Sequence, residues 1–210
     1  MKNRLLAVMA LCGATSSTLP LWAAEWENPI PNFVEPNLAT DGTGGGVYYV
    51  YHVATQKFIT CGNYNKTWGT EVVVADEGKK LDLTYDTDYE LSNRPETDKE
   101  YSNAKGWRFT MWDGKSNTGR HELYYSPSDN AFCVDHNKQG HMLWKISPVG
   151  DGNYRIKISD EDPTYGLNSE HAEEYVGLVD ETRTGVDAFI NPEMAGNEKA
   201  QLDWRFVTPE

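Results

Sequence analysis

Trp107-Arg108-Phe109 is the stretch that says most about the fold, because the chain repeats its pattern as Trp144-Lys145-Ile146 and as Trp204-Arg205-Phe206. Each copy places a Trp, a basic residue and an apolar residue in succession. Only seven Trp occur in 210 residues, so three such matches indicate a repeated structural unit. Successive side chains of a strand face opposite sides, so we expect each Trp to point inward and its basic neighbour outward.

Residues 1–24 have the pattern of a secretory signal peptide. Lys2 and Arg4 precede the apolar stretch Leu5 to Leu11, and the small residues Ala23 and Ala24 provide a cleavage point. The apolar stretch is too short for a transmembrane helix. We therefore expect a secreted protein, extracellular or periplasmic, with no membrane insertion after the signal is removed.

The charge of the chain limits its partners. Acidic residues outnumber basic ones by 32 to 19, which gives a formal net charge of -13. A chain this acidic repels the phosphates of nucleic acids and the headgroups of anionic lipids. We therefore expect no nucleic-acid binding. The sequence contains no phosphate-binding loop or other cofactor motif, so we also expect no cofactor.

The chain beyond the signal divides into an arm and a domain. Residues 25–46 are predicted to form a Pro/Gly-rich arm, because Pro29, Pro31 and Pro36 oppose regular structure. Residues 47–210 alternate short β-rich runs with turns, and no apolar period of 3.6 residues persists there. Residues 86–105 are polar and acidic and are predicted to be an insertion in this domain.

The domain is predicted to be all-β and built from three similar units. The β-rich run Val47–Val53 meets a turn at Ala54–Gln56 and returns through Lys57–Thr60, which is the pattern of a hairpin. In Asn153–Ile158 apolar residues alternate with basic ones, as in a half-buried strand. Each unit is predicted to contain a hairpin, a return strand and a closing strand that carries Trp.

Three hairpin-bearing units that each close on a Trp strand resemble the β-trefoil, and more narrowly the ricin-type lectin-like family. The stretch Tyr48–Thr60 is also similar to an exported bacterial trefoil-like family, in which the opening strand leads through a turn to a Lys-Phe-Leu/Ile return. The resemblance implies a β-trefoil-like barrel of three pseudo-repeats closing on Trp107, Trp144 and Trp204. It also implies carbohydrate binding.

The chain departs from the ricin-type pattern at one position of each unit. Ricin-type units carry a Gln two residues before the Trp, whereas Lys105, Met142 and Leu202 stand at those positions here. The Trp is the core member of that motif, so the expected fold is unaffected. The sugar site that the resemblance implies lacks its polar partner in all three units.

Candidate ligand-binding residues lie outside the repeated Trp strands. Asn63, Tyr64 and Trp68 share one loop of turn-forming residues, and Asp135 follows the second return strand. Aromatic rings stack on the C–H faces of sugars, while Asn and Asp hydrogen-bond to hydroxyl groups. The alternatives are that Trp68 packs beneath its loop and that Asp135 is a solvated turn residue.

Other chemistry is poorly supported by the sequence. The acidic residues 86–90 begin like a calcium loop, but Leu91 stands where Gly is needed, and Asp160–Asp162 is typical of a solvated acidic loop. We therefore expect no metal site. No nucleophile, zinc or phosphate-loop motif occurs. Cys61 and Cys133 either form a disulfide or stay as two buried thiols.

The sequence thus favours a secreted, non-catalytic, lectin-like module that binds carbohydrate through Asn63, Tyr64, Trp68 and Asp135. The alternative is a protein-interaction or inhibitor-like module at the cell surface, with the acidic insertion as its contact surface. An enzyme is the third possibility, because the separation of carboxylate pairs cannot be read from sequence.

Overall fold

The computed structural model describes residues 31–61, 70–86, 105–112, 120–126, 131–135, 143–162 and 171–209. The chain divides into two compact units, Met1–Pro31 and Asn32–Glu210, and all the strands belong to the second. Within the described residues the regular structure is β-strand and no α-helix is present. Accordingly, this part of the chain offers no helix with the length and apolarity to cross a membrane. The all-β prediction is confirmed.

Thirteen strands are described along the chain. Their bounds are β1 Phe33–Val34, β2 Gly46–His52, β3 Lys57–Cys61, β4 Thr70–Ala75, β5 Leu81–Asp86, β6 Gly106–Trp112, β7 Arg120–Ser126, β8 Ala131–Asp135, β9 Trp144–Gly150, β10 Asn153–Ile158, β11 Tyr175–Gly177, β12 Asp187–Ile190 and β13 Trp204–Val207. The predicted hairpin over residues 47–60 corresponds to β2 and β3, which pair antiparallel.

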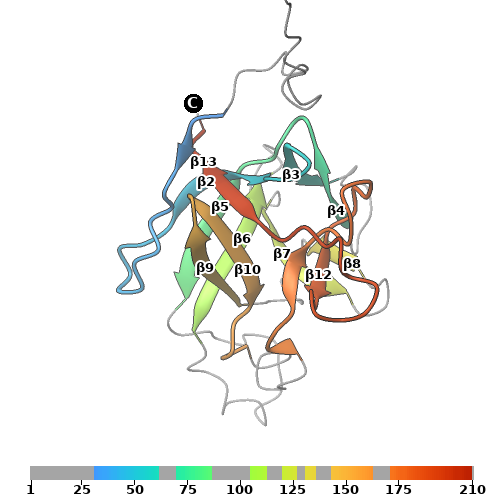
Figure 1. Ribbon diagram of the computed structural model, residues 1–210. Coiled ribbons are helices and arrows are strands. Elements are labelled where there is room, and N and C mark those ends of the chain that lie inside the picture. Colours follow the sequence, from blue (N-terminus) through green and yellow to red (C-terminus); the bar gives the residue numbers. More distant parts are fainter. Residues whose placement is uncertain are drawn as a thin grey trace, which may run out of the picture. The chain divides into compact units, whose positions relative to one another are not determined.

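Eleven of the strands form one sheet whose pairings include a ring. From β2 the antiparallel pairings pass to β5, β6, β9, β10 and β13, and β13 pairs again with β2. Figure 1 shows β5 beside β6, and β9 beside β10. Of the remaining strands, β1, β3 and β7 pair with the ring strands β13, β2 and β6, and β11 and β12 form a separate two-stranded sheet.

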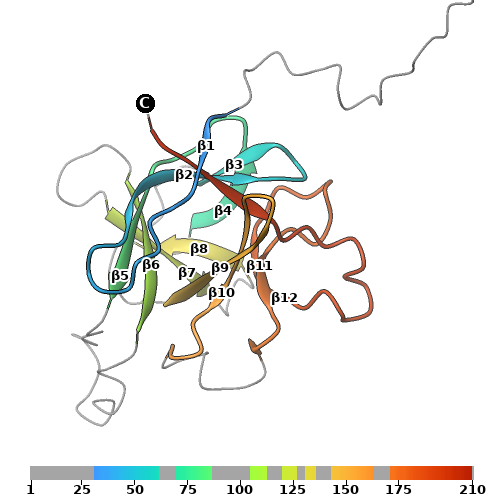
Figure 2. The same cartoon turned by 60° about the vertical axis from the view of Figure 1, so that its left-hand side comes forward.

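Strands β2 to β13 divide into three units of four, namely β2–β5, β6–β9 and β10–β13. In each unit the first and last strands belong to the ring, and the middle two form a hairpin: β3–β4, β7–β8 and β11–β12. Hairpin strand β4 pairs with β8 and is bridged to the third unit at Val73 and Gly185. Figure 2 shows the same arrangement from a second side. The fold is therefore trefoil-like, as predicted.

The three units share one register. In each, a buried aromatic residue of the first strand lies opposite a buried apolar residue of the last strand. These pairs are Tyr48 with Leu81, Trp107 with Trp144, and Tyr154 with Trp204. Inward side chains alternate with outward ones along a strand, so residues two positions away also face the core. One core cluster contains all six residues together with these neighbours.

This register corrects one prediction about the Trp pattern. Trp144 and Trp204 lie on the last strands of their units, as predicted, but Trp107 lies on β6, the first strand of the second unit. Its equivalents are Tyr48 and Tyr154. The pattern of Trp, basic and apolar residue does not distinguish the first strand of a unit from the last strand. Both kinds of strand alternate an inward aromatic residue with an outward basic one.

The indole groups of the two closing-strand Trp residues bind backbone carbonyls of their own units. Trp204 Nε1 donates to the Val176 carbonyl at 2.9 Å, and Trp144 Nε1 donates to the Leu123 carbonyl at 3.4 Å. Val176 and Leu123 lie at equivalent places, on the second strands β11 and β7. A large apolar ring therefore enters the core without leaving its N–H group unsatisfied.

The first unit satisfies the equivalent carbonyl in another way. Leu81 occupies the place of the Trp, and the backbone N–H of Lys79 donates to the Ile59 carbonyl at 3.0 Å. Ile59 is on β3, the second strand of that unit. In the first unit, the backbone N–H of Lys79 thus takes the place of the Trp indole N–H as the donor to this carbonyl.

His52 is a polar residue within the apolar core. It is fully buried at the place that Met111 and Ile158 occupy in the other units, and its ring lies 4.7 Å from the Trp204 ring. One ring nitrogen, Nε2, is 3.1 Å from the Gln201 carbonyl, and Nδ1 is 2.9 Å from Thr55 Oγ1. Burial, only partly offset by the Gln201 carbonyl, lowers the pKa of His52 below its ordinary value.

Part of the predicted arm belongs to the sheet. Phe33 and Val34 form β1, which pairs with β13 opposite Val207 and Phe206. The Phe33 ring lies 5.1 Å from the Tyr51 ring. An extended segment can add to a sheet edge despite neighbouring prolines, since the prolines themselves lie outside the strand.

Cys61 and Cys133, the two cysteines outside the predicted signal peptide, lie on strands that flank β4. Cys61 of β3 pairs with Val72, and Cys133 of β8 pairs with Glu71. Two strand spacings separate the backbones by about 10 Å. The Cα atoms of a disulfide lie within about 7 Å of each other. This arrangement of strands therefore does not favour a bond between Cys61 and Cys133.

We expect Trp204→Phe to destabilise the protein more than Trp144→Phe does. Both changes remove an indole from a fully buried site, but the Trp204 hydrogen bond is the shorter of the two. Leaving the Val176 carbonyl unsatisfied costs about 1–3 kcal/mol. Urea unfolding of the two variants checks this, and equal losses would contradict the role given to the indole hydrogen bond.

We also expect a pH-dependent contribution to stability from His52. Its lowered pKa means that the folded state binds fewer protons than the unfolded state, so this contribution is complete above about pH 6.5 and is lost as pH falls below it. The loss is at most about 1.4 kcal/mol per pH unit. Urea unfolding between pH 8 and 5 measures it.

His52→Met, which copies the residue at the equivalent place of the second unit, serves as the comparison for this effect. The acidic side chains titrate alike in both proteins, so the difference between them isolates the histidine. If the unfolding free energies of the His52→Met variant and the unsubstituted protein change with pH in parallel, the pH dependence does not come from His52.

Candidate functional site

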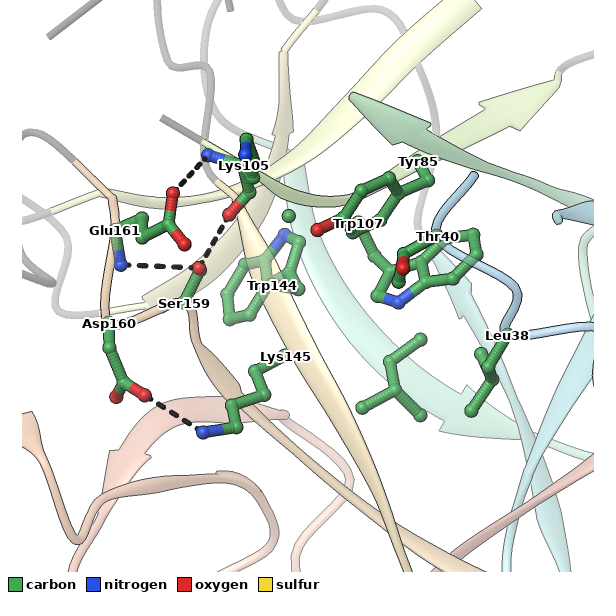
Figure 3. A pocket seen from close by; sticks show the side chains of 12 residues that line it. Leu38, Thr40, Tyr85, Lys105, Trp107, Trp144, Lys145, Ser159, Asp160 and Glu161 are labelled. Carbon is green, nitrogen blue, oxygen red and sulfur yellow. Dashed lines mark hydrogen bonds and ion pairs between the residues drawn. The ribbon is translucent and has the colours of Figure 1, made fainter. Parts of the chain in front are cut away.

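A pocket of about 270 Å³ opens where β6, β9 and β10 meet the segment after β1. We call it the Trp107 pocket. Its lining comes from five separate stretches of the chain: Leu38 and Thr40, Tyr85, Lys105–Trp107, Trp144–Ile146, and Ser159–Glu161. Figure 3 shows the Tyr85 and Trp107 rings on one side and Ser159, Asp160 and Glu161 on the other.

Gly106 allows the strands to approach one another at this place. A Cβ atom there would lie 2.8 Å from the Cβ of Leu143 and 3.1 Å from the Cβ of Ser159. Leu143 is fully buried and has no space into which to move. A glycine at this position is therefore required for β6 to begin against the ends of β9 and β10.

Hydrogen bonds fix the polar wall of the pocket. The Ser159 hydroxyl donates to the Lys105 carbonyl at 2.7 Å, and the Lys105 N–H donates to Glu161 Oε2 at 3.1 Å. The Glu161 N–H in turn donates to Ser159 Oγ at 3.3 Å. Three residues thus form a cyclic set of contacts that ties the start of β6 to the end of β10 (Figure 3).

The apolar wall is aromatic. The rings of Tyr85 and Trp107 meet edge to face, with centroids 5.0 Å apart and an interplanar angle of 63°. Trp107 is buried and Tyr85 is half-buried, so Tyr85 is the more accessible ring. Burial first, and then the charge of Glu161, raise the pKa of the Tyr85 phenol. The phenol stays protonated and able to donate a hydrogen bond.

An ion pair with two lysines lies at the rim. Asp160 accepts from Lys145 Nζ at 2.8 Å and from Lys157 Nζ at 2.9 Å. The hydrogen bonds from Lys145 and Lys157 lower the pKa of Asp160, and the hydrogen bond with Asp160 raises the pKa of Lys145. The rim is exposed, so this pair contributes little to stability, but it holds Asp160 ionised and in place.

The pocket combines features that suit a polar ligand with apolar faces. It offers an accessible aromatic ring beside hydroxyl, carboxylate and ammonium groups, within a volume that holds a small molecule. The described residues contain no group of three or more His, Cys, Asp and Glu side chains arranged to hold a metal ion. Within the acidic stretch 160–162, Asp160 binds the lysines, and Asp162 accepts from the buried N–H of Leu143.

The structure tests little of the site predicted from sequence. Asn63, Tyr64 and Trp68 lie outside the described residues. Asp135 is described only in its backbone, where it ends β8 opposite Glu122. Their assignment as ligand-binding residues stays a prediction.

Thr70, the first described residue after residues 62–69, pairs with Val134, the neighbour of Asp135. The backbone of Asp135 therefore lies beside the start of β4.

Sequence reasoning assigned Trp107 to the core and did not find the pocket beside it. The lining residues are distant in the chain, and only Gly106, next to a Trp at a strand start, gave a local signal. A Gly at the start of an otherwise β-rich strand marks a close approach of two segments.

Comparisons with known proteins identify no relative by sequence: neither a protein-family model nor a curated protein matches. A salivary protein from Culex quiquefasciatus of the Cysteine and Tryptophan-Rich (CWRC) family matches in structure, with a TM-score of 0.49 and 14% identity, over 82% of this chain and 99% of that one. The designed 3-fold symmetric protein ThreeFoil matches with a TM-score of 0.45 and 11% identity, over 78% and 99% respectively. The function of this chain is therefore argued from its own residues.

We expect Gly106→Ala to lower the free energy of unfolding by about 1–3 kcal/mol, because the added methyl group overlaps the buried Leu143 side chain. Chemical denaturation measures the change. Ser147→Ala on the neighbouring strand β9 is the matched control and is expected to have little effect. A Gly106→Ala protein as stable as the control would contradict the close approach described above.

Proposed function

We propose that this chain is an exported, non-catalytic binding protein for carbohydrate. The observation that carries the proposal is the Trp107 pocket, where the accessible Tyr85 ring lies on one side and the Asp160 carboxylate on the other, with Thr40 also in the lining (Figure 3). Sugars present C–H faces to aromatic rings and hydroxyl groups to polar side chains. The signal-like residues 1–24 support export.

The proposal includes a closed β-trefoil barrel. The ring of six pairings that begins and ends at β2, with a hairpin in each of three units, supports it. In such a barrel the closing contact is between β13 and β2. The resemblance of the Trp strands to ricin-type lectins also supports a closed barrel, although the Gln of that family is missing.

The charge state of the pocket supports binding rather than hydrolysis. Glycoside hydrolysis requires a carboxylic acid that stays protonated near neutral pH and donates to the leaving group. The two lysines lower the pKa of Asp160, which keeps that side chain ionised. Glu161 is engaged with the Lys105 N–H as part of the pocket wall. Asp160 therefore suits accepting hydrogen bonds from sugar hydroxyls.

The loop site predicted from sequence belongs to the same proposal. Asn63, Tyr64, Trp68 and Asp135 are proposed as a second set of carbohydrate contacts. The pairing of Thr70 with Val134 supports this, because Thr70 follows Trp68 closely in sequence and Val134 precedes Asp135. The two sites are separable by mutation, since they share no residue.

A glycan array of the mature protein tests the proposal. We expect a defined set of glycans to bind, and substitution of the stacking ring to weaken binding about tenfold, which corresponds to about 1.4 kcal/mol. A loss in Tyr85→Ala assigns binding to the Trp107 pocket, whereas a loss in Trp68→Ala assigns it to the loop.

Phe33→Ala, which removes a half-buried aromatic ring outside both sites, is the control for nonspecific damage. An array without glycan signal would contradict the proposal, and so would a signal unchanged in both Tyr85→Ala and Trp68→Ala. Thermal unfolding of each variant shows whether a loss of binding reflects loss of the fold.

A further inference from the structure

A second hollow, of about 330 Å³, lies over the outer side of β2 and β3. Tyr49 of β2 and Phe58 of β3 line it, together with Glu77 and Gly78 from the connection between β4 and β5. Tyr49 alternates with the buried residues Tyr48 and Val50, so its ring faces away from the core. The hollow shares no lining residue with the Trp107 pocket.

Two aromatic rings form the floor of this hollow. The rings of Tyr49 and Phe58 meet nearly edge to face, with centroids 5.9 Å apart and an interplanar angle of 67°. Phe58 is held from its other side by Tyr51, whose ring centroid is 5.1 Å away. The floor is therefore a fixed pair of rings at a large angle to each other, which can meet one ligand group from two sides.

Gly78 brings the chain directly onto these rings. A Cβ atom at this position would lie 2.7 Å from the Cβ of Phe58 and 3.1 Å from Cδ1 of Tyr49. No other residue type fits there without moving the ring pair. The glycine thus places Glu77, the residue before it, at the edge of the aromatic floor.

Among the described residues that line the hollow, Glu77 is the charged one. Aromatic faces carry negative potential and attract organic cations, and a nearby carboxylate adds a direct charge attraction. The chain as a whole carries a net charge of -13, which further favours the approach of a cation.

We propose that this hollow binds the cationic headgroup of a quaternary ammonium compound, with Tyr49 and Phe58 as the ring contacts and Glu77 as the counter-charge. A neutral sugar would stack on the rings and donate hydrogen bonds to Glu77, but it would lack the direct charge attraction. An affinity that depends on the charge of the ligand therefore distinguishes ammonium binding from sugar binding. The inference does not rest on carbohydrate binding at the Trp107 pocket.

Titration of the mature protein with choline, followed through the NMR resonances of the Tyr49 and Phe58 rings, tests this site. We expect saturable shifts in the millimolar range. The neutral analogue 3,3-dimethyl-1-butanol has the same shape without the charge, and we expect it to bind at least fivefold more weakly. Equal binding of the two compounds would overturn the proposal, as would choline shifts that do not saturate.

Glu77→Gln removes the charge and keeps the shape of an exposed side chain, so it should leave the fold intact. We expect it to weaken choline binding about fivefold, whereas Glu193→Gln, an exposed Glu elsewhere, leaves binding unchanged. Phe58→Leu should also weaken it. Choline affinity unaffected by both Glu77→Gln and Phe58→Leu would overturn the assignment.

Phosphatidylcholine vesicles distinguish two sources of the same headgroup. Retention of the protein by such vesicles, reversed by free choline, would assign the site to a lipid headgroup. Choline binding without retention would assign it to a soluble ammonium compound. Vesicle retention that free choline does not reverse would count against headgroup recognition in this hollow.

Discussion

Tyr48, Trp107 and Tyr154 each lie opposite a buried apolar residue on the last strand of their own unit, and this shared register determines how the rest of the core packs. A shift of one residue in any of these strands would turn its aromatic side chain to solvent and bring outward basic residues such as Arg205 into the core. The pseudo-threefold pattern is therefore a consequence of burial. The Trp107 pocket and the hollow over β2 and β3 both depend on this register, because it determines which residues lie at strand ends and which face outward.

Much of this fold was accessible from sequence because strand alternation is a local signal. The alternation in 153–158 predicted β10, and the turn at 54–56 predicted the first hairpin. No such signal predicts β12, because Phe189 is apolar and stands between the buried Ala188 and Ile190, so apolar and polar residues do not alternate. Trp107 was assigned to a closing strand because its local pattern matches that of Trp204. Only the pairings with β5 and β9 show that β6 begins the second unit.

The Trp107 pocket was much less predictable. Thr40, Tyr85 and Ser159 are neighbours only after the chain has folded, and each is unremarkable where it stands in the sequence. The pocket also depends on Gly106, whose place next to a Trp at a strand start is a local signal, whereas its close approach to Leu143 exists only in the folded chain. The predicted loop site differs, because Asn63, Tyr64 and Trp68 are local to one another. The grouping of Asp135 with these residues stays a prediction.

The central structural claim is that β13 returns to β2 and completes the ring of pairings. Nuclear Overhauser effects across these strands test it most directly. The account predicts cross-strand contacts between Trp204 and His52 and between Phe206 and Val50, together with slow exchange of the amides that join the two strands. Fast-exchanging amides along β2 and β13, without contacts between the two strands, would contradict it.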